Sequence, residues 1–347
     1  MKTIGSLLLV VCISVLLPGF CAYGQRQYAT QQTSGKTGGG EVRDPGEPVD
    51  FPDLTDPSRL KVNGLAETAY QVLKFPEGVE ANTPVTIRLR WKSSISLLGG
   101  LTVQPMMDGT PVPGGFSSGA TLALLQSGNE ENVTLVPAAN YNEVRISIAS
   151  GVLSSAEVEI FYAYYLADPV VNVVPNPVCQ GERAQLQVLN TSPGLEYRLY
   201  TSENAAGYLI RSTNGIFITP AVNSETTFYV ASAEGTSTTR VSRRIPVLVQ
   251  IRPRPAIAAI PDRTVCEGES LDLDTLNPEV ESGSTGGSYV WSLTYGGPPL
   301  LSNIITPFVG TSTYWVRYTV NGCSDEKSVT VRTSPKPAPI IVSISTN

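Results

Sequence analysis

The chain has 347 residues and a net charge of −6, so it lacks the basic excess expected of a protein that binds nucleic acid. It contains 31 Gly, 27 Pro and no histidine. The absence of histidine excludes Ser-His-Asp triads, Cys-His pairs and His-ligated zinc or iron. The Gly and Pro content favours short strands and turns.

Residues 1–24 have the pattern of a secretory signal peptide. Lys2 precedes an apolar run over 4–17, which is too short for an ordinary membrane span, and residues 22–24 (Ala-Tyr-Gly) match a small-x-small cleavage site. No later segment is apolar over 18 residues, so we expect no transmembrane segment. The protein is therefore expected outside the cell or on its outer surface, with the periplasm as the alternative.

Residues 25–48 are polar and rich in Gly, Gln and Thr, which predicts a flexible leader. Residues 49–167 instead alternate between apolar and polar side chains, the period of a strand buried on one face. The apolar positions of three such runs are Val85, Ile87, Leu89 and Trp91, then Val144, Ile146 and Ile148, then Val158, Ile160, Tyr162 and Tyr164. Turn residues separate the runs, so we predict an antiparallel β-sandwich over 49–167.

A repeat begins near residue 168. The stretch NPVCQGERAQLQV at 176–188 returns as DRTVCEGESLDLD at 262–274, and similar short strands follow each copy in the same order. Six or seven strands in each copy predict two tandem immunoglobulin (Ig)-like β-sandwich modules over 168–252 and 253–335, in an all-β chain. Pro-rich joints near residues 253 and 335 predict stiff linkers.

Residues 336–347 form the tail of the sequence. Ile340 to Ile344 have the pattern of a first strand, which predicts a truncated third module, with a short strand-like tail as the alternative.

Three cysteines follow the signal segment. Cys266 and Cys323 flank the middle strands of the second copy, so we predict a disulfide between them, consistent with export. The first copy has Thr236 where the second has Cys323, which leaves Cys179 without a partner in its own module. Cys179 is then a buried unpaired thiol, a reactive or intermolecular thiol, or a partner for Cys266 or Cys323 across two modules.

Few residues suggest chemistry. Asp50, Asp53 and Asp56 lie close together and could bind calcium, although their spacing matches no EF-hand and is also typical of turns. Exposed tyrosines could stack on sugar rings or pack in a core, and the candidates are Tyr162, Tyr164, Tyr165, Tyr197 and Tyr200. Because the chain has no phosphate loop, nucleophile elbow or CxxC motif, we expect no enzymatic activity and no cofactor.

The second copy, with Cys266, Trp291, Tyr314 and Asn-Gly-Cys at 321–323, resembles the Ig-like modules of large Bacteroidota surface proteins. Those proteins are adhesin-like and associated with gliding or attachment. The first copy is less similar, because Thr236 replaces the second cysteine. Asp-Thr-Leu at 274–276 also resembles the O-glycosylation acceptor of exported Bacteroidota proteins, which makes Thr275 a candidate.

The resemblance implies an exported adhesive or structural stalk that contacts other cell-surface proteins or extracellular glycans. The alternative is a carbohydrate-binding accessory protein of a polysaccharide-utilising system. Any binding is expected in the sandwich over 49–167, and the Ig-like modules are expected to act mechanically by holding that sandwich away from the cell.

Overall fold

The structure is a computed structural model that describes residues 25–50, 54–92, 100–117, 129–150, 155–283 and 285–337. The predicted signal peptide at 1–24 and the strand-like part of the tail at 340–344 lie outside these residues. The described chain is all-β, as predicted, with short 3-10 turns η1 (Glu47–Val49) and η3 (Leu273–Leu276). None of its helical segments is long and apolar enough to cross a membrane.

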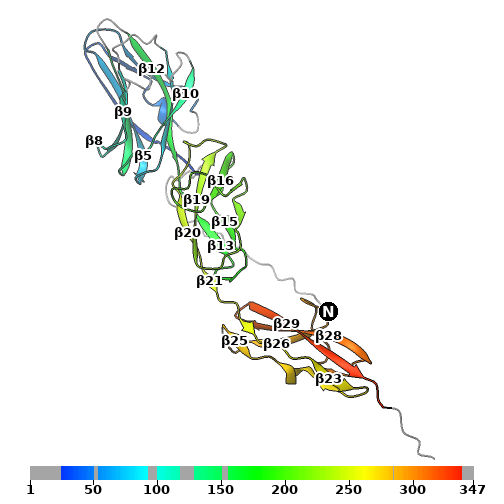
Figure 1. Cartoon of the computed structure of the whole chain (residues 1–347). Helices are drawn as coiled ribbons and strands as arrows, with labels where there is room; N and C mark the ends of the chain where they lie inside the picture. Colours follow the sequence, from blue (N-terminus) through cyan, green and yellow to red (C-terminus); the bar gives the residue numbers. More distant parts are fainter. Residues whose placement is uncertain are drawn as a thin grey trace, which may run out of the picture. The chain divides into compact units, whose positions relative to one another are not determined.

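The chain divides into two compact units that are interleaved along the sequence. Figure 1 shows the strands of the described chain, coloured by their place in the sequence. The first unit contains residues 1–170, 188–215 and 229–245, and the second contains 171–187, 216–228 and 246–347. The module boundaries at 168, 253 and 335 therefore stay predictions.

The N-terminal sandwich has two six-stranded sheets. One has the order β10-β6-β12-β4-β3, with β1 paired to β12, and the other has the order β2-β5-β11-β7-β8, with β9 paired to β7. The strands of the first sheet are β1 (Arg26–Tyr28), β3 (Glu41–Arg43), β4 (Ser58–Val62), β6 (Val85–Trp91), β10 (Glu130–Leu135) and β12 (Ala156–Leu166). Those of the second are β2 (Gln31–Thr37), β5 (Thr68–Val79), β7 (Gly100–Met107), β8 (Thr110–Pro111), β9 (Phe116–Ser117) and β11 (Tyr141–Ala149).

The core of this sandwich follows the alternating pattern of the sequence. Ile87 and Leu89 of β6, Ile146 of β11 and Ile160 of β12 are all fully buried in one cluster. Because every second side chain of a strand points to the same face, these strands bury one face and leave polar residues on the other.

The flexible leader predicted over 25–48 was wrong, because three strands form there. β2 is polar but pairs antiparallel with β5 through backbone groups, which hydrogen-bond whatever the side chains are. Gly35 leaves room for the ring of Tyr70, because a Cβ atom there would lie 2.4 Å from the hydroxyl oxygen of Tyr70 and the ring would have to shift. Low hydrophobicity therefore did not mean disorder, since these strands add to sheets that already bury a core.

The first Ig-like copy contains a three-stranded sheet in the order β13-β15-β18 and a four-stranded sheet in the order β17-β16-β19-β20. Its strands are β13 (Val171–Val174), β14 (Val178–Cys179), β15 (Gln185–Val188), β16 (Leu195–Tyr200), β17 (Ile210–Ser212), β18 (Ile216–Ile218), β19 (Thr226–Glu234), β20 (Ile245–Val249) and β21 (Ile251–Arg252). β14 pairs in parallel with β21.

The second copy contains a four-stranded sheet in the order β23-β29-β28-β26 and the pairs β22-β25 and β24-β27. Its strands are β22 (Ala256–Ile257), β23 (Arg263–Cys266), β24 (Leu271–Asp272), β25 (Val280–Ser282), β26 (Ser288–Ser292), β27 (Ile304–Ile305), β28 (Gly310–Val320) and β29 (Cys323–Ser334). Trp291 is fully buried at the centre of its core, and its indole N–H donates to Asn277 Oδ1 at 3.0 Å. This is the buried aromatic of a middle strand that the Ig-like pattern predicts.

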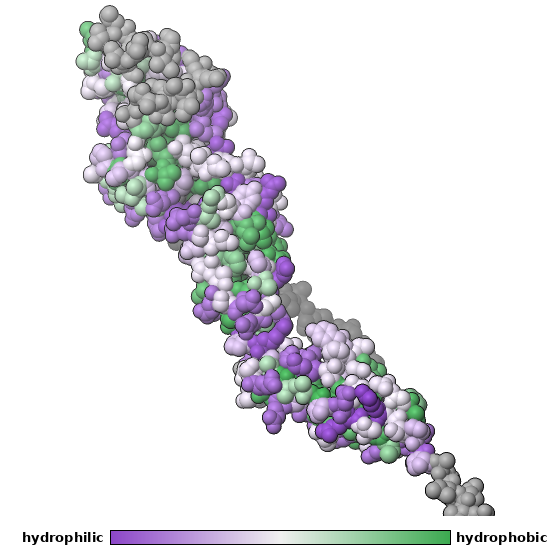
Figure 2. Space-filling view, in the orientation of Figure 1, coloured by the Kyte–Doolittle hydropathy of each residue, from purple (hydrophilic) through white to green (hydrophobic). Residues whose placement is uncertain are grey.

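Apolar residues also reach the surface. Figure 2 shows hydrophobic residues interspersed with hydrophilic ones on the described surface. In the second copy, Phe308 is 91% exposed and Tyr295 is 71% exposed, with its ring edge-on to Trp315.

Candidate functional site

The cysteines pair differently from the prediction. Cys179 and Cys323 form the disulfide, with their Cα atoms 5.6 Å apart, and Cys266 is a free, exposed thiol. Both bonded residues lie in the second compact unit. The predicted Cys266–Cys323 bond and the unpaired Cys179 were therefore wrong, and one of the cross-module pairings left open by the sequence is the one observed.

The strand register explains why Cys266 cannot reach Cys323. β23 runs parallel to β29 and places Cys266 opposite Ser334, whereas Cys323 begins β29 at its other end. A strand rises about 3.3 Å per residue, so the two cysteines are separated by roughly 35 Å of strand. A disulfide needs Cα atoms within about 7 Å. Similar positions in a repeated motif therefore did not define the pair.

The other predicted site residues do not assemble into a site. No group of three or more His, Cys, Asp or Glu side chains suited to a metal occurs in the described part of the chain. Asp50 and Asp56 are exposed, while Asp53 lies outside the described residues. Thr275 is exposed in η3, where its hydroxyl donates to the carbonyl oxygen of Asp272 at 2.6 Å. Its glycosylation stays a prediction.

The candidate tyrosines divide between two environments. Tyr197 and Tyr200 are buried in β16 of the first Ig-like copy. Tyr165 packs against the core of the N-terminal sandwich, with its ring centroid 5.3 Å from that of Phe75. For these three tyrosines the structure supports core packing, which was one of the two roles that the sequence allowed, rather than stacking on sugars.

A β-bulge sends Tyr162 and Tyr164 to the other face. The pairing of β12 with β6 shifts between Ile160 and Tyr162, so Tyr162 lies opposite Arg88 rather than opposite a core residue. Strict alternation predicted both tyrosines on the core face, and this was wrong, because one extra residue in a strand reverses every side chain that follows. The bulge therefore brings two tyrosines onto the outer, polar face of this sheet.

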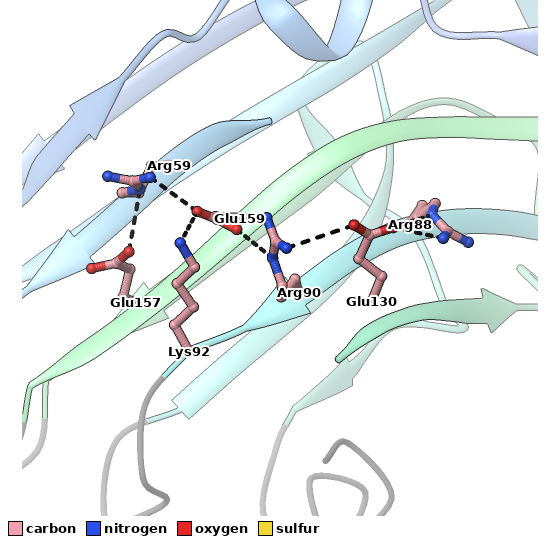
Figure 3. Close-up of polar contacts among 7 residues, drawn as sticks. All are labelled: Arg59, Arg88, Arg90, Lys92, Glu130, Glu157 and Glu159. Carbon is pink, nitrogen blue, oxygen red and sulfur yellow. Dashed lines mark hydrogen bonds and ion pairs between the residues drawn. The ribbon is translucent and has the colours of Figure 1, made fainter. Parts of the chain in front are cut away.

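A row of charged side chains occupies the same outer face, as Figure 3 shows. It contains Arg59, Arg88, Arg90, Lys92, Glu130, Glu157 and Glu159. Neighbouring strands provide opposite charges at facing positions, because β6 contributes cations while β10 and β12 contribute acids. We call this set the ionic row.

Glu159 is the centre of the ionic row and is 1% exposed. Its carboxylate accepts from Arg59 at 3.0 Å, from Arg90 at 2.6 Å and from Lys92. Burial by itself raises the pKa of this carboxyl, but the hydrogen bonds from Lys92, Arg90 and Arg59 together hold its pKa below the ordinary value. Glu159 therefore stays ionised, whereas the acid of a glycoside hydrolase needs a raised pKa.

The row continues through Glu130, which binds Arg88 at 2.6 Å and lies 3.7 Å from Arg90. Beyond Arg88 the face becomes aromatic. The ring of Tyr162 meets the ring of Tyr28 from β1 edge-on, with centroids 5.5 Å apart. The ring centroid of Tyr28 also lies 5.5 Å from that of Tyr164.

The aromatic end is closed by a second carboxylate, that of Glu234, which is partly buried with its side chain 16% exposed. Glu234 accepts hydrogen bonds from Arg26 at 2.6 Å and from Arg240 at 2.9 Å. Burial raises its pKa, but the hydrogen bonds from Arg26 and Tyr164 and the charge of Arg26 hold the pKa below its ordinary value. The outer face thus combines the half-buried rings of Tyr28 and Tyr162, beside the buried Tyr164, with charged hydrogen-bonding groups, a combination suited to sugars.

Sequence reasoning found part of this face. Arg88 and Arg90 alternate with Ile87, Leu89 and Trp91 in the sequence, which predicts both arginines on the face opposite the core, and the structure confirms this. It did not find the acidic partners, because pairing β12 and β10 with β6 depends on topology. It also missed Tyr28, which lies in the segment predicted as a leader.

Comparison with known proteins supports the Ig-like part. Residues 167–253 match the family model described as "Ig-like domain CHU_C associated", an Ig-like domain of the Bacteroidota type. The match lies on the first copy, although the cysteine motif is more complete in the second. No curated protein matches the chain.

Several solved structures match the chain at low identity and with low TM-scores. They include a beta-1,2-glucanase from Parabacteroides distasonis, with 12% identity, a TM-score of 0.30 and coverage of 66% of this chain. The adhesin domain of Epf from Streptococcus pyogenes has 9% identity and a TM-score of 0.28, covering 67% of this chain and 98% of that domain. A family 32 carbohydrate-binding module from C. perfringens NanJ has 12% identity and a TM-score of 0.26, covering 40% and 98%. The chain spans 39% of the glucanase, and similarities this low carry no argument about function.

Proposed function

We propose that this chain is an exported, non-enzymatic surface protein whose Ig-like modules form an adhesive or structural stalk. The observation that carries the proposal is the match of residues 167–253 to an Ig-like family of the Bacteroidota type. The Cys179–Cys323 disulfide supports export, because such bonds persist in oxidising compartments. The Pro-rich joints near residues 253 and 335 support a stalk, since proline restricts φ.

Labelling of intact cells tests the location. Antibodies against the chain should label unpermeabilised cells of the source organism, and added protease should remove the signal. Deletion of residues 1–24 should abolish labelling while the protein remains detectable in the lysate. Labelling that appears only after lysis contradicts the proposal. Deletion of the whole gene should then reduce attachment, and a copy encoding the full chain should restore it.

The ionic row argues against one catalytic role, that of Glu159 as a general acid. Its most buried carboxylate, Glu159, is held ionised by three cations and cannot donate a proton near neutral pH. The test is to measure whether the pure protein releases reducing ends from polysaccharides. Release that Glu159→Gln abolishes would contradict this part of the proposal.

A carbohydrate-binding function is the second candidate, and the outer face of the N-terminal sandwich favours it. Tyr28 and Tyr162 provide ring surface beside the charged groups of Arg88 and Glu130. A glycan array with the full chain should then show sugar-specific binding that Tyr162→Ala weakens. Tyr295→Ala is a control, because this tyrosine is 71% exposed and lies in the second Ig-like copy, outside the N-terminal sandwich. Equal loss in both variants would argue against the face.

A further inference from the structure

A hollow of about 360 Å³ lies on the first Ig-like copy, within the first compact unit. Its volume is in the range of small-molecule sites, about 300–1,000 Å³. The polar and aromatic side chains that line it are Arg198, Tyr200, Tyr208, Thr236, Thr238 and Arg244. They come from β16, from the connection that follows it and from the segment between β19 and β20.

Arg198 lines the hollow, and its positive charge is paired with the carboxylate of Glu196. It is 4% exposed, and Glu196 accepts from its Nε at 2.7 Å. Its Nη1 and Nη2 atoms donate to the carbonyl oxygens of Ser237 and Gly235, both at 2.7 Å. Because its charge and its donors are matched by the protein, Arg198 holds the shape of the hollow and is not the group that attracts a ligand.

Arg244 is different. Its Nη1 donates to the carbonyl oxygens of Glu203 and Ala205, and its guanidinium carbon lies 3.8 Å from the centre of the Tyr200 ring. No carboxylate of the described residues lies within ion-pair distance of Arg244, and its Nε and Nη2 atoms have no hydrogen-bond partner there. Stacking on Tyr200 fixes the plane of the guanidinium, so these remaining N–H groups form a positioned donor pair with an uncompensated charge.

Tyr208 provides aromatic surface beside this charge. It is 45% exposed, its ring meets Tyr200 edge-on, and the guanidinium of Arg198 lies 5.4 Å from its centroid. A tyrosine held by neighbours on one side and open on the other can stack on the apolar face of a sugar ring. The side chains of Thr236 and Thr238 add hydroxyl groups that can both donate and accept.

We infer that this hollow binds a carboxylated sugar, such as a hexuronic acid residue of an acidic glycan. The guanidinium of Arg244 matches a carboxylate in a two-bond geometry, the ring of Tyr208 stacks on the pyranose, and Thr236 and Thr238 bond its hydroxyls. The inference deepens the adhesive function proposed above, and rests on it for the biological setting alone. A sulfated sugar has a related charge but lacks the planar carboxylate that the guanidinium matches.

The test is calorimetric titration of the full exported chain with trigalacturonate. Parallel titrations use neutral galactotriose, a sulfated galactose oligomer and an oligoglutamate peptide. We expect binding of trigalacturonate below about 1 mM and at least about tenfold weaker binding of the neutral sugar. Equal affinity for the sulfated sugar or for the peptide would overturn the assignment to a carboxylated sugar.

Variants locate the site. Arg244→Gln and Tyr208→Ala should each weaken binding of trigalacturonate about tenfold. Arg244→Lys keeps the charge without the planar fork and should recover only part of the affinity. Arg211→Gln is the matched control, because Arg211 lies in the same copy outside the hollow, with its side chain 60% exposed and 4.0 Å from Glu196. It should bind as the unchanged chain does.

Two results would overturn the inference: no binding of trigalacturonate at about 10 mM, or binding that survives Arg244→Gln while thermal unfolding shows all variants folded. These results are separable from the proposed function. Loss of the sugar site with the protein still on the cell surface removes only this inference. Sugar binding by a protein that remains inside the cell removes the surface function and leaves the site.

Discussion

The Cys179–Cys323 disulfide can be distinguished experimentally from the Cys266–Cys323 pairing that motif similarity predicted. We expect the double variant Cys179→Ser/Cys323→Ser to lose stability, while Cys266→Ser does not. The reason lies in the chain connectivity, because the bond closes a loop with a sequence separation of 144 residues. Cutting it frees that loop in the unfolded state.

The magnitude follows from loop-closure entropy. A cross-link over about 145 residues restricts the unfolded chain by about 5 kcal/mol at 25 °C in the chain-entropy model. This figure is the upper limit of the stability loss, and it applies if the whole segment from Cys179 to Cys323 unfolds in one cooperative transition. Cys266 is exposed and unbonded, so replacing it should change the free energy of unfolding by less than about 0.5 kcal/mol.

Two measurements check this prediction. Alkylation of the unreduced protein should modify one thiol of the mature chain, and peptide mapping should place it at Cys266 and recover Cys179 linked to Cys323. Urea unfolding, followed by tryptophan fluorescence that includes the buried Trp91 and Trp291, should give a lower midpoint for the double variant and for the reduced protein. A peptide linking Cys266 to Cys323, or an equal loss of stability in Cys266→Ser, refutes the reasoning.

Three further predictions concern side chains of known environment. Glu159→Gln should lower the free energy of unfolding, measured in urea, by about 3 kcal/mol, because it leaves three cations around a buried neutral group. Glu157→Gln should lower it less, because the Glu157 side chain is 21% exposed and pairs with one cation, Arg59, at 3.2 Å. The pKa of Glu159 is lower in the folded chain than in the unfolded chain, so ionised Glu159 stabilises the fold fully above the unfolded pKa of about 4.3. This stabilisation is lost as the pH falls through the folded pKa. The Glu159→Gln variant should lack this part of the pH dependence of stability. Trp291→Ala should cost about 3–5 kcal/mol by emptying the core of the second copy, measured as a lower urea midpoint, and an unchanged midpoint would contradict the burial. Phe308→Ser should leave the thermal midpoint unchanged, because this side chain is 91% exposed, and a clear loss of stability would show that it is covered.

The strands were the most predictable part of the fold, because burial of one face dictates an alternation that the sequence displays directly. Ile87 and Leu89 lie in the core as that alternation requires. The rule failed at Tyr162, where a bulge adds one residue to β12. A bulge depends on how the partner strand is registered. The apolar Phe161 interrupts the alternation after Ile160, but such an interruption does not by itself reveal a bulge.

The leader failed for a related reason. Composition predicts whether a segment can bury a core of its own, and residues 31–37 cannot. It does not predict whether the segment can extend an existing sheet, where the backbone supplies the hydrogen bonds. The tight contact of Gly35 with Tyr70 is a tertiary feature, visible only when β2 and β5 are side by side.

The candidate sites follow the same division between local and non-local information. A charged or aromatic residue can be assigned to an outer face from alternation alone, as with Arg88. Its chemical role depends on what the neighbouring strand brings opposite. Glu159 becomes a saturated acceptor because β4 and β6 surround it with cations, whereas Arg244 keeps its charge because only backbone carbonyls of the described residues reach it. The buried, fully paired groups therefore mark where this chain stabilises its fold, and Arg244, which has no carboxylate partner among the described residues, marks the ligand site that we infer.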